Sequence, residues 1–170
     1  MNESNMDIIT LNNIDKLHPK IRQEARSIYD EICTRLSGDA TVRFNHTLRT
    51  FAEQDALFAQ GRTTAGKIVT KAKAGLSYHN YGLAIDIVLL VKKKDGNNAE
   101  RWDVKTDFDG DNIADWIECV QVFKEHGFDW GGDWKFLDLP HFQKTFGFSV
   151  RELLRLYNNK KVDKNNYVLI

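Results

Sequence analysis

The sequence predicts a single α+β domain in which a small, mainly antiparallel sheet is flanked by helices. β-favouring residues run from Leu83 to Val91, and residues 40–47 alternate between apolar and polar as a strand does. Apolar residues recur at helical spacing in residues 21–36 and again in residues 113–123. A turn signal at Asp95-Gly96 follows the strand at Leu83 to Val91, which favours an antiparallel hairpin.

Length and composition fit one ordinary globular domain. The chain has 170 residues, of which 42% are hydrophobic and 28% are charged, so intrinsic disorder is not expected. The formal net charge is zero, which argues against a nucleic-acid-binding protein that depends on positive charge. We expect one domain over residues 1–170, with a core at about 17–157 and a tail at 158–170, because no repeat or linker marks a second domain.

In the first half of the chain, local signals define two helices, a strand and a long loop. Pro19 suits the first turn of a helix that ends before Gly38. The strand at residues 40–47 leads to Thr50 and Glu53, whose T-x-x-E spacing is a capping box that opens a short helix to Gln60. Residues 61–76 are rich in Gly, Thr and Lys and are expected to form a functional loop.

In the second half, a return strand near residues 101–104 is expected after the Asp95-Gly96 turn. A helix then ends at Gly127, and residues 128–134 return to the sheet with a tight turn at Gly131-Gly132. Ser149 and Glu152 form another capping box, which opens a short last helix to Tyr157.

Two short motifs contain residues that are suited to a catalytic metal centre. SYHNYGLAID contains His79 and Asp86, and DLPHF contains Asp138 and His141. A catalytic zinc ion takes three protein ligands and leaves one position open, and His79, Asp86 and His141 match that number and those types. Asp138 would then be a spare carboxylate that can act as a general base. Each histidine could instead be an ordinary polar residue.

Asp86 strengthens the metal hypothesis. It stands within an apolar run that is expected to be a core strand. An unpaired buried carboxylate is costly, so it requires a cation or a dense set of hydrogen bonds.

The chain resembles a family of zinc peptidases that cut peptidoglycan stem peptides and share their fold with the hedgehog signalling domain. SYHNYGLAID matches the family's S-x-H-x-x-G-x-A-x-D signature. Further similarity covers Leu48 to Thr64, Gly66 to Asp86 and Gly127 to Gln143. The combination is most similar to the L-alanyl-D-glutamate endopeptidases of cell-wall remodelling and phage lysis. The resemblance implies that His79, Asp86 and His141 bind one zinc ion and that Asp138 is the catalytic residue.

The resemblance also implies a set of substrate-binding residues. Arg49 stands where a strand ends and a helix begins, and its planar guanidinium suits a carboxylate. In the family, the matching arginine holds a carboxylate of the stem peptide, although a surface salt bridge would also explain it. Gln54, Ser77, Trp130 and Trp134 are expected to contact substrate as well, and core packing is the alternative for the two tryptophans.

Three functions remain open at this point. The first is an L-alanyl-D-glutamate endopeptidase, and the second is a D-alanyl-D-alanine carboxypeptidase with the same zinc ligands and base. The third is a zinc-containing recognition module without catalysis. The matches at residues 48–64 and 130–134 favour the endopeptidase. In each case the expected partner is the peptidoglycan stem peptide, and we expect a monomer.

The N-terminus, MNESNMDIITLNN, lacks the apolar run of a signal peptide, and no stretch approaches the ~20 apolar residues of a membrane span. We therefore expect synthesis in the cytoplasm and action on the wall after release or export. Cys33 and Cys119 are expected to be small core residues, and the sequence leaves their pairing open.

A second metal site is suggested by an acidic segment. Asp107, Asp109 and Asp111 alternate, and Glu118 is twelfth counting from Asp107, as in a calcium-binding loop. The sixth position is Asn112, where such a loop has glycine. The alternative is that these acidic residues favour the start of the following helix through its dipole.

Overall fold

The computed structural model describes residues 7–170 and confirms the α+β class. Its α-helices are α1 (Ile8–Ile14), α2 (Pro19–Arg35), α3 (Phe51–Ala59), α4 (Asp115–Glu125) and α5 (Val150–Asn158). Its strands are β1 (Ala40–His46), β2 (Ala84–Lys92), β3 (Asn98–Arg101), β4 (Asp129–Trp130) and β5 (His141–Gln143). Two short 3₁₀ turns, η2 (Tyr78–Tyr81) and η3 (Gly131–Asp133), complete the set.

The strands form one antiparallel sheet whose order is β1-β2-β5-β4. The long strand β2 is central: β1 pairs along one edge, while β3 and β5 share the other. β5 pairs with the first residues of β2, and β3 pairs with its last residues. The start of β2 therefore lies between β1 and β5, two segments that are about 100 residues apart along the chain.

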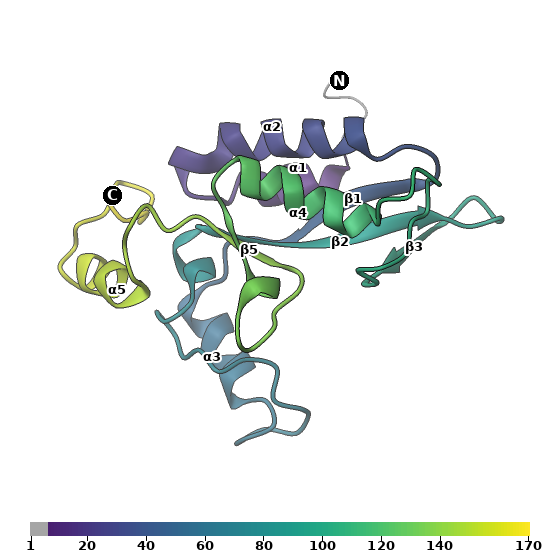
Figure 1. Ribbon diagram of the computed structural model, residues 1–170. Coiled ribbons are helices and arrows are strands. Elements are labelled where there is room, and N and C mark those ends of the chain that lie inside the picture. Colours follow the sequence, from purple (N-terminus) through teal and green to yellow (C-terminus); the bar gives the residue numbers. More distant parts are fainter. Residues whose placement is uncertain (1–6) are drawn as a thin grey trace.

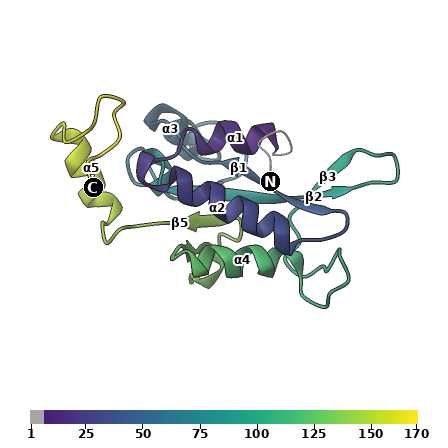
Figure 2. The same ribbon diagram turned by 90° about the horizontal axis from the view of Figure 1, so that it is seen from above.

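Helices cover the two faces of the sheet unequally. In Figure 1, α1, α2 and α4 lie over one face and α3 lies beyond the other, and Figure 2 shows α2 running between α1 and α4. Phe44 of β1, Phe123 of α4 and Phe142 of β5 meet in the core, and the rings of Phe123 and Phe142 stack with centroids 4.1 Å apart. Burial of such large aromatic side chains is a main source of the domain's stability.

Local capping explains where several helices begin. The predicted capping boxes at Thr50–Glu53 and Ser149–Glu152 are both present, and each satisfies backbone N–H groups of the first turn. Pro19 occupies the first turn of α2, and the His18 side chain accepts a hydrogen bond from Lys20 N as the cap.

Some segments differ from the sequence prediction. The return strand is Asn98–Arg101, a few residues before the expected 101–104. Within residues 128–134, Asp129–Trp130 return to the sheet as β4, and the turn predicted at Gly131-Gly132 is present as η3. The structure also contains α1, which the sequence patterns did not predict. Its Asn13 side chain donates to the carbonyl oxygens of Phe44 and Asn45, so α1 depends on contacts with a distant strand.

The C-terminal segment, residues 158–170, packs against the domain. Val168 is buried in the core, and its carbonyl oxygen lies 2.8 Å from Nε2 of His18. Cys33 and Cys119 are free thiols. Within residues 7–170, no helix is long and apolar enough to cross a membrane.

Candidate metal centre

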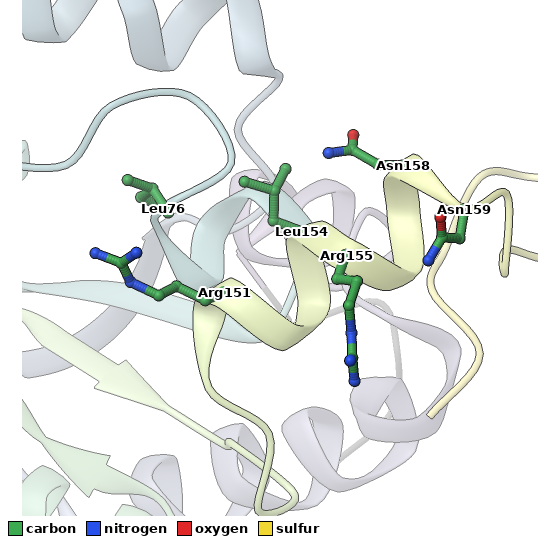
Figure 3. Close-up of a pocket in the computed structure, with 6 residues that line it drawn as sticks. All are labelled: Leu76, Arg151, Leu154, Arg155, Asn158 and Asn159. Carbon is green, nitrogen blue, oxygen red and sulfur yellow. The ribbon is translucent and has the colours of Figure 1, made fainter.

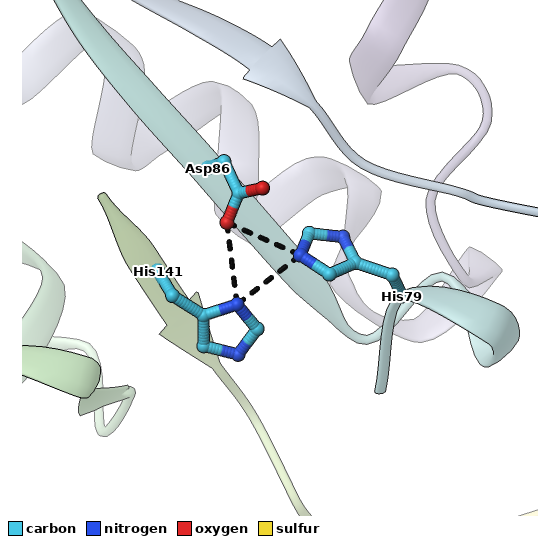
Figure 4. Close-up of side chains that lie close together, drawn as sticks. All are labelled: His79, Asp86 and His141. Carbon is cyan, nitrogen blue, oxygen red and sulfur yellow. Dashed lines mark hydrogen bonds and ion pairs between the residues drawn. The ribbon is translucent and has the colours of Figure 1, made fainter. Parts of the chain in front are cut away.

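Three residues singled out in the sequence meet at the start of the central strand. Nε2 of His79, Oδ1 of Asp86 and Nδ1 of His141 lie 3.1–3.2 Å from one another (Figure 4). His79 and His141 are buried, and Asp86 is 17% exposed at its side chain. The three atoms form a nearly equilateral triangle, so all three can face one central ion.

The sheet positions two of the three residues. Asp86 and His141 are direct partners in the β2–β5 register, and residues opposite each other on antiparallel strands direct their side chains to the same face. Asp86 is therefore the one acidic residue in the otherwise apolar first part of β2. Its side chain lies on the face of the sheet opposite to the core phenylalanines. His46 of β1 is paired with Asp86 on the other side and is exposed.

His79 is held by the turn η2. The Ser77 side chain caps this turn by accepting from His79 N, and Gly82 ends it in the left-handed conformation with φ 66°. A Cβ atom at Gly82 would lie 2.7 Å from the backbone nitrogen of His18, so the turn requires glycine for space as well as for φ. Ser77 thus acts on His79 directly.

Hydrogen bonds on the outer side of each ring fix where the protons are. Nδ1 of His79 lies 2.6 Å from the carbonyl oxygen of Thr47, and Nε2 of His141 lies 3.1 Å from Oε1 of Gln143. Both oxygens can only accept, so each outer nitrogen carries a proton and donates it. In the neutral rings, the inner nitrogens then present lone pairs toward Asp86.

This donor set fits a tetrahedral zinc ion. Three lone-pair atoms at 3.1–3.2 Å from one another repel unless a cation lies between them. Zinc–ligand distances of about 2.0–2.1 Å at tetrahedral angles give ligand–ligand separations of about 3.3–3.4 Å, close to those observed. The outer hydrogen bonds to Thr47 and Gln143 are the second-sphere contacts that metal-binding histidines usually make.

The electrostatics of the centre favour positive charge at the same point. Burial alone would raise the pKa of Asp86, but His79 and His141 outweigh it and hold that pKa well below its usual range. Burial lowers the pKa of His141, but its contact with Asp86 reverses the direction and raises it. The carboxylate is therefore ionised and attracts a proton or a metal ion to the space between the rings.

Asp138 lies on the loop between η3 and β5. Its backbone nitrogen donates to Gly131 O, and its carbonyl oxygen accepts from His141 N. Burial raises the pKa of its carboxyl group; among the charged neighbours, His141 lowers that pKa and Asp86 raises it. Asp138 thus lies within electrostatic reach of all three metal-ligand candidates, since His79 also lowers its pKa. Within residues 7–170 its side chain accepts no hydrogen bond.

Arg49 lies beside Asp86 at the edge of the centre. Its Nη2 lies 3.9 Å from Oδ2 of Asp86, and its Nη1 donates to Oε1 of Gln54 at 3.1 Å. Gln54 is fully buried, and its Nε2 donates to the carbonyl oxygen of Ala72. The contacts of Gln54 therefore make it a positioning residue for Arg49 and for the loop at residues 61–76.

The two tryptophans differ in their relation to the centre. The Trp134 ring lies 5.3 Å from the His141 ring, centroid to centroid, and is 36% exposed. Trp130 instead donates from Nε1 to the carbonyl oxygen of Leu139, which braces the loop that precedes His141. Trp134 is thus the tryptophan placed to touch a ligand.

A separate hollow lies between α5 and the segment before η2. Its lining residues are Leu76, Arg151, Leu154, Arg155, Asn158 and Asn159 (Figure 3). None of these side chains is a histidine, cysteine or carboxylate, so this hollow is not a second metal centre.

Comparison with known proteins places this centre in a family. A sequence model of the family described as D-alanyl-D-alanine carboxypeptidase matches residues 70–144, which contain His79, Asp86, Asp138 and His141. The chain is 44% identical over 128 residues to the peptidoglycan L-alanyl-D-glutamate endopeptidase CwlK of Bacillus subtilis (strain 168), covering 75% of this chain and 72% of the relative. This chain belongs to that family of peptidoglycan peptidases.

A phage protein is also similar. The L-alanyl-D-glutamate peptidase of Listeria phage A118 is 30% identical over 138 residues, which are 81% of this chain and 41% of the phage protein. The chain therefore spans about two fifths of this second member of the peptidase family.

Sequence reasoning missed two residues of the centre, Thr47 and Gln143. Gln143 stands two positions after His141 on the same strand and therefore on the same face, a signal that could have indicated it. Thr47 contributes its backbone carbonyl, for which the sequence has no signal.

Proposed function

We propose that this protein is a zinc-dependent endopeptidase that hydrolyses the bond between L-alanine and D-glutamate in peptidoglycan stem peptides. The observation that carries the proposal is the convergence of His79, Asp86 and His141 within the region that matches the peptidase family. The 44% identity to an L-alanyl-D-glutamate endopeptidase supports the choice of bond.

In this proposal His79, Asp86 and His141 hold the ion. A bound zinc ion would supply the Lewis acidity that polarises the scissile carbonyl and acidifies the attacking water. Asp138 accepts the proton of that water and passes it to the leaving amine, because an ionised carboxylate beside the centre is an adequate general base.

Arg49 would bind the carboxylate of the D-glutamate residue. Its side chain is 18% exposed, so a bound carboxylate would be largely removed from water. Gln54 fixes one guanidinium nitrogen, which leaves the other nitrogens of the fork available. Trp134 lies on the His141 side of the centre and would contact another part of the stem peptide.

A D-alanyl-D-alanine carboxypeptidase is the second candidate, because the matching family model carries that description. Mass spectrometry of purified muropeptides before and after digestion separates the two activities. We expect a new N-terminus at D-glutamate and release of the peptide from L-alanine. Loss of only a terminal D-alanine would contradict the proposed bond. Either activity requires the protein to reach the cell wall.

A further inference from the structure

The acidic segment between β3 and α4 forms a compact cluster of carboxylates. Five acidic residues and no basic residue lie between Asp107 and Glu118. Carboxylate oxygens of Asp107, Asp109 and Asp115 lie within 4.8 Å of one another, and so do those of Asp109, Asp111 and Glu118. The two groups share Asp109, so all five carboxylates belong to one connected cluster.

Two of these carboxylates are buried, and each has one oxygen without a hydrogen-bond partner. Asp115 is fully buried and Glu118 is 5% exposed, and neither Oδ2 of Asp115 nor Oε2 of Glu118 has a hydrogen-bond partner. In the part of the chain from residue 7 onward, none of the five carboxylates forms a salt bridge. Burial, with Asp111, Asp109 and Asp115 adding to it, raises the pKa of Glu118 to about 7. Unpaired buried carboxylate oxygens are costly, and a bound cation would relieve that cost at both residues.

Helix capping does not explain the cluster. The N-cap of α4 is Ala114, which offers no side-chain cap, and Oδ1 of Asp115 accepts from Phe108 N at 2.8 Å instead of from its own helix. Asp115 and Glu118 are in the first turn, where the helix dipole favours negative charge. That effect is typically about 0.3–1 kcal/mol at exposed sites and does not account for two buried, unpartnered oxygens.

The backbone of the segment suits a twelve-residue calcium loop. Asn112 has φ 75°, so it adopts at the sixth position the left-handed conformation for which such loops use glycine. Counting from Asp107, carboxylates stand at positions 1, 3, 5, 9 and 12, which is the ligand spacing of these loops. We propose that Asp107, Asp109, Asp111, Asp115 and Glu118 form a calcium-binding site.

Such a site would connect the acidic segment to the rest of the fold. Oδ2 of Asp109 accepts from the backbone nitrogen and hydroxyl of Ser37, in the connection between α2 and β1. Glu118 belongs to α4, whose Phe123 stacks on Phe142, the residue after His141. Calcium would therefore stabilise the packing of α4 against the strand that carries His141.

The experiment is a titration of the full-length protein with calcium chloride in excess zinc, followed by calorimetry and thermal unfolding. We expect saturable binding of one ion with a dissociation constant at or below about 10⁻³ M, the weak limit for extracellular calcium modules. At about one hundred times that constant, Tm should rise by about 5–10 °C for a chain of this size. Magnesium should give a smaller shift, because it prefers compact octahedral sites that retain water.

Three variants make the test specific. Glu118→Gln and Asp109→Asn should lose the calcium-dependent rise in Tm, whereas Asp95→Asn, which changes the same charge on an exposed hairpin, should retain it. Without calcium, Glu118→Gln should melt at or above the parent temperature, because it removes an unpaired buried charge. No calcium-dependent shift in the parent, an equal shift with magnesium, or a shift retained in both cluster variants would overturn the proposal. These readouts do not depend on hydrolysis of peptidoglycan.

Discussion

At the scale of single residues, Asp138 separates a peptidase from a recognition module, because a module needs no carboxylate beside the metal. We predict that Asp138→Ala retains zinc and the fold but loses at least about 10²-fold in hydrolysis, the usual contribution of general acid–base catalysis. Zinc content by elemental analysis, Tm and the rate of muropeptide cleavage are the three measurements. Unchanged cleavage would show that another residue is the general base, and His46, the β1 partner of Asp86, would be tested next.

Arg49 can be tested by a substitution series on one purified stem peptide. Arg49→Ala should reduce kcat/KM by an amount equivalent to about 2–5 kcal/mol if the arginine pairs with a desolvated carboxylate. Arg49→Lys should also be impaired, because it keeps the charge but loses the planar fork. Arg101→Ala, on the exposed strand β3, is the matched control and should be silent. Equal kcat/KM for the parent and Arg49→Ala, with zinc bound in both, would remove Arg49 from substrate binding.

For single residues, the sequence predicted which side chains could bind a metal better than it predicted which side chains contact one another. The residue types His79, Asp86 and His141 and the apolar surroundings of Asp86 were sufficient to suggest a metal centre. The role of Gln54 was not accessible in the same way. Its amide lies between Arg49 and the Ala72 carbonyl, and that arrangement depends on how the loop at 61–76 folds back on α3.

At the scale of elements, the turn η2 holds His79 and depends on Gly82. Gly82→Ala would require a left-handed alanine and would place its Cβ against the backbone of His18. We predict a lower Tm and weaker zinc retention, with a left-handed alanine alone costing roughly 1–2 kcal/mol. Gly96→Ala is the matched control, because Gly96 has φ 82° but no atom within 4 Å of the added Cβ.

Comparing Gly82→Ala with Gly96→Ala separates the effect of the steric contact with His18 from the effect of the left-handed backbone conformation. Both should lose stability through the backbone conformation, but only Gly82→Ala should lose zinc. If both variants retain the parent's zinc content after dialysis, the close approach of Gly82 to His18 does not position the metal centre.

Elements whose signals are local were predictable, and those that depend on distant partners were not. The capping boxes of α3 and α5 need only four consecutive residues, and both were correctly predicted. Helix α1 has no capping box, only an N-cap in which the Asp7 side chain accepts from Thr10 N, and the Asn13 amide nitrogen donates to carbonyl oxygens of β1. The turn at Gly131-Gly132 was also predictable, because its two glycines are consecutive, and it limits β4 to two residues.

At the scale of the whole molecule, the fold class followed from the alternation of strand and helix patterns, but the sheet order did not. The order β1-β2-β5-β4 inserts β5 beside the start of β2, and this pairing alone brings His141 to Asp86. The core that supports it, with Phe123 stacked on Phe142, lies on the opposite face from the metal ligands. Metal binding and folding should therefore be coupled, because an ion held by His79, Asp86 and His141 would join β2, β5 and η2.

Metal removal tests that coupling. In saturating calcium, zinc-free protein should be inactive and should melt at a lower temperature than the zinc-loaded form. With free zinc at about one hundred times its dissociation constant, binding contributes about 2.7 kcal/mol, or about 5–10 °C in Tm at this chain length. Zinc addition should restore both activity and Tm.

The variant His141→Ala tests whether the zinc-dependent rise in Tm comes from the His79–Asp86–His141 triangle. It removes one ligand and leaves Asp86 and His79 without their third partner, so zinc should no longer raise its Tm. Because Asp138 is absent from the ligand set, Asp138→Ala should keep the parent's zinc-dependent rise while remaining inactive. A zinc-dependent rise that survives in His141→Ala would place the ion away from the His79–Asp86–His141 triangle, since a buried three-ligand site cannot lose a ligand without losing affinity.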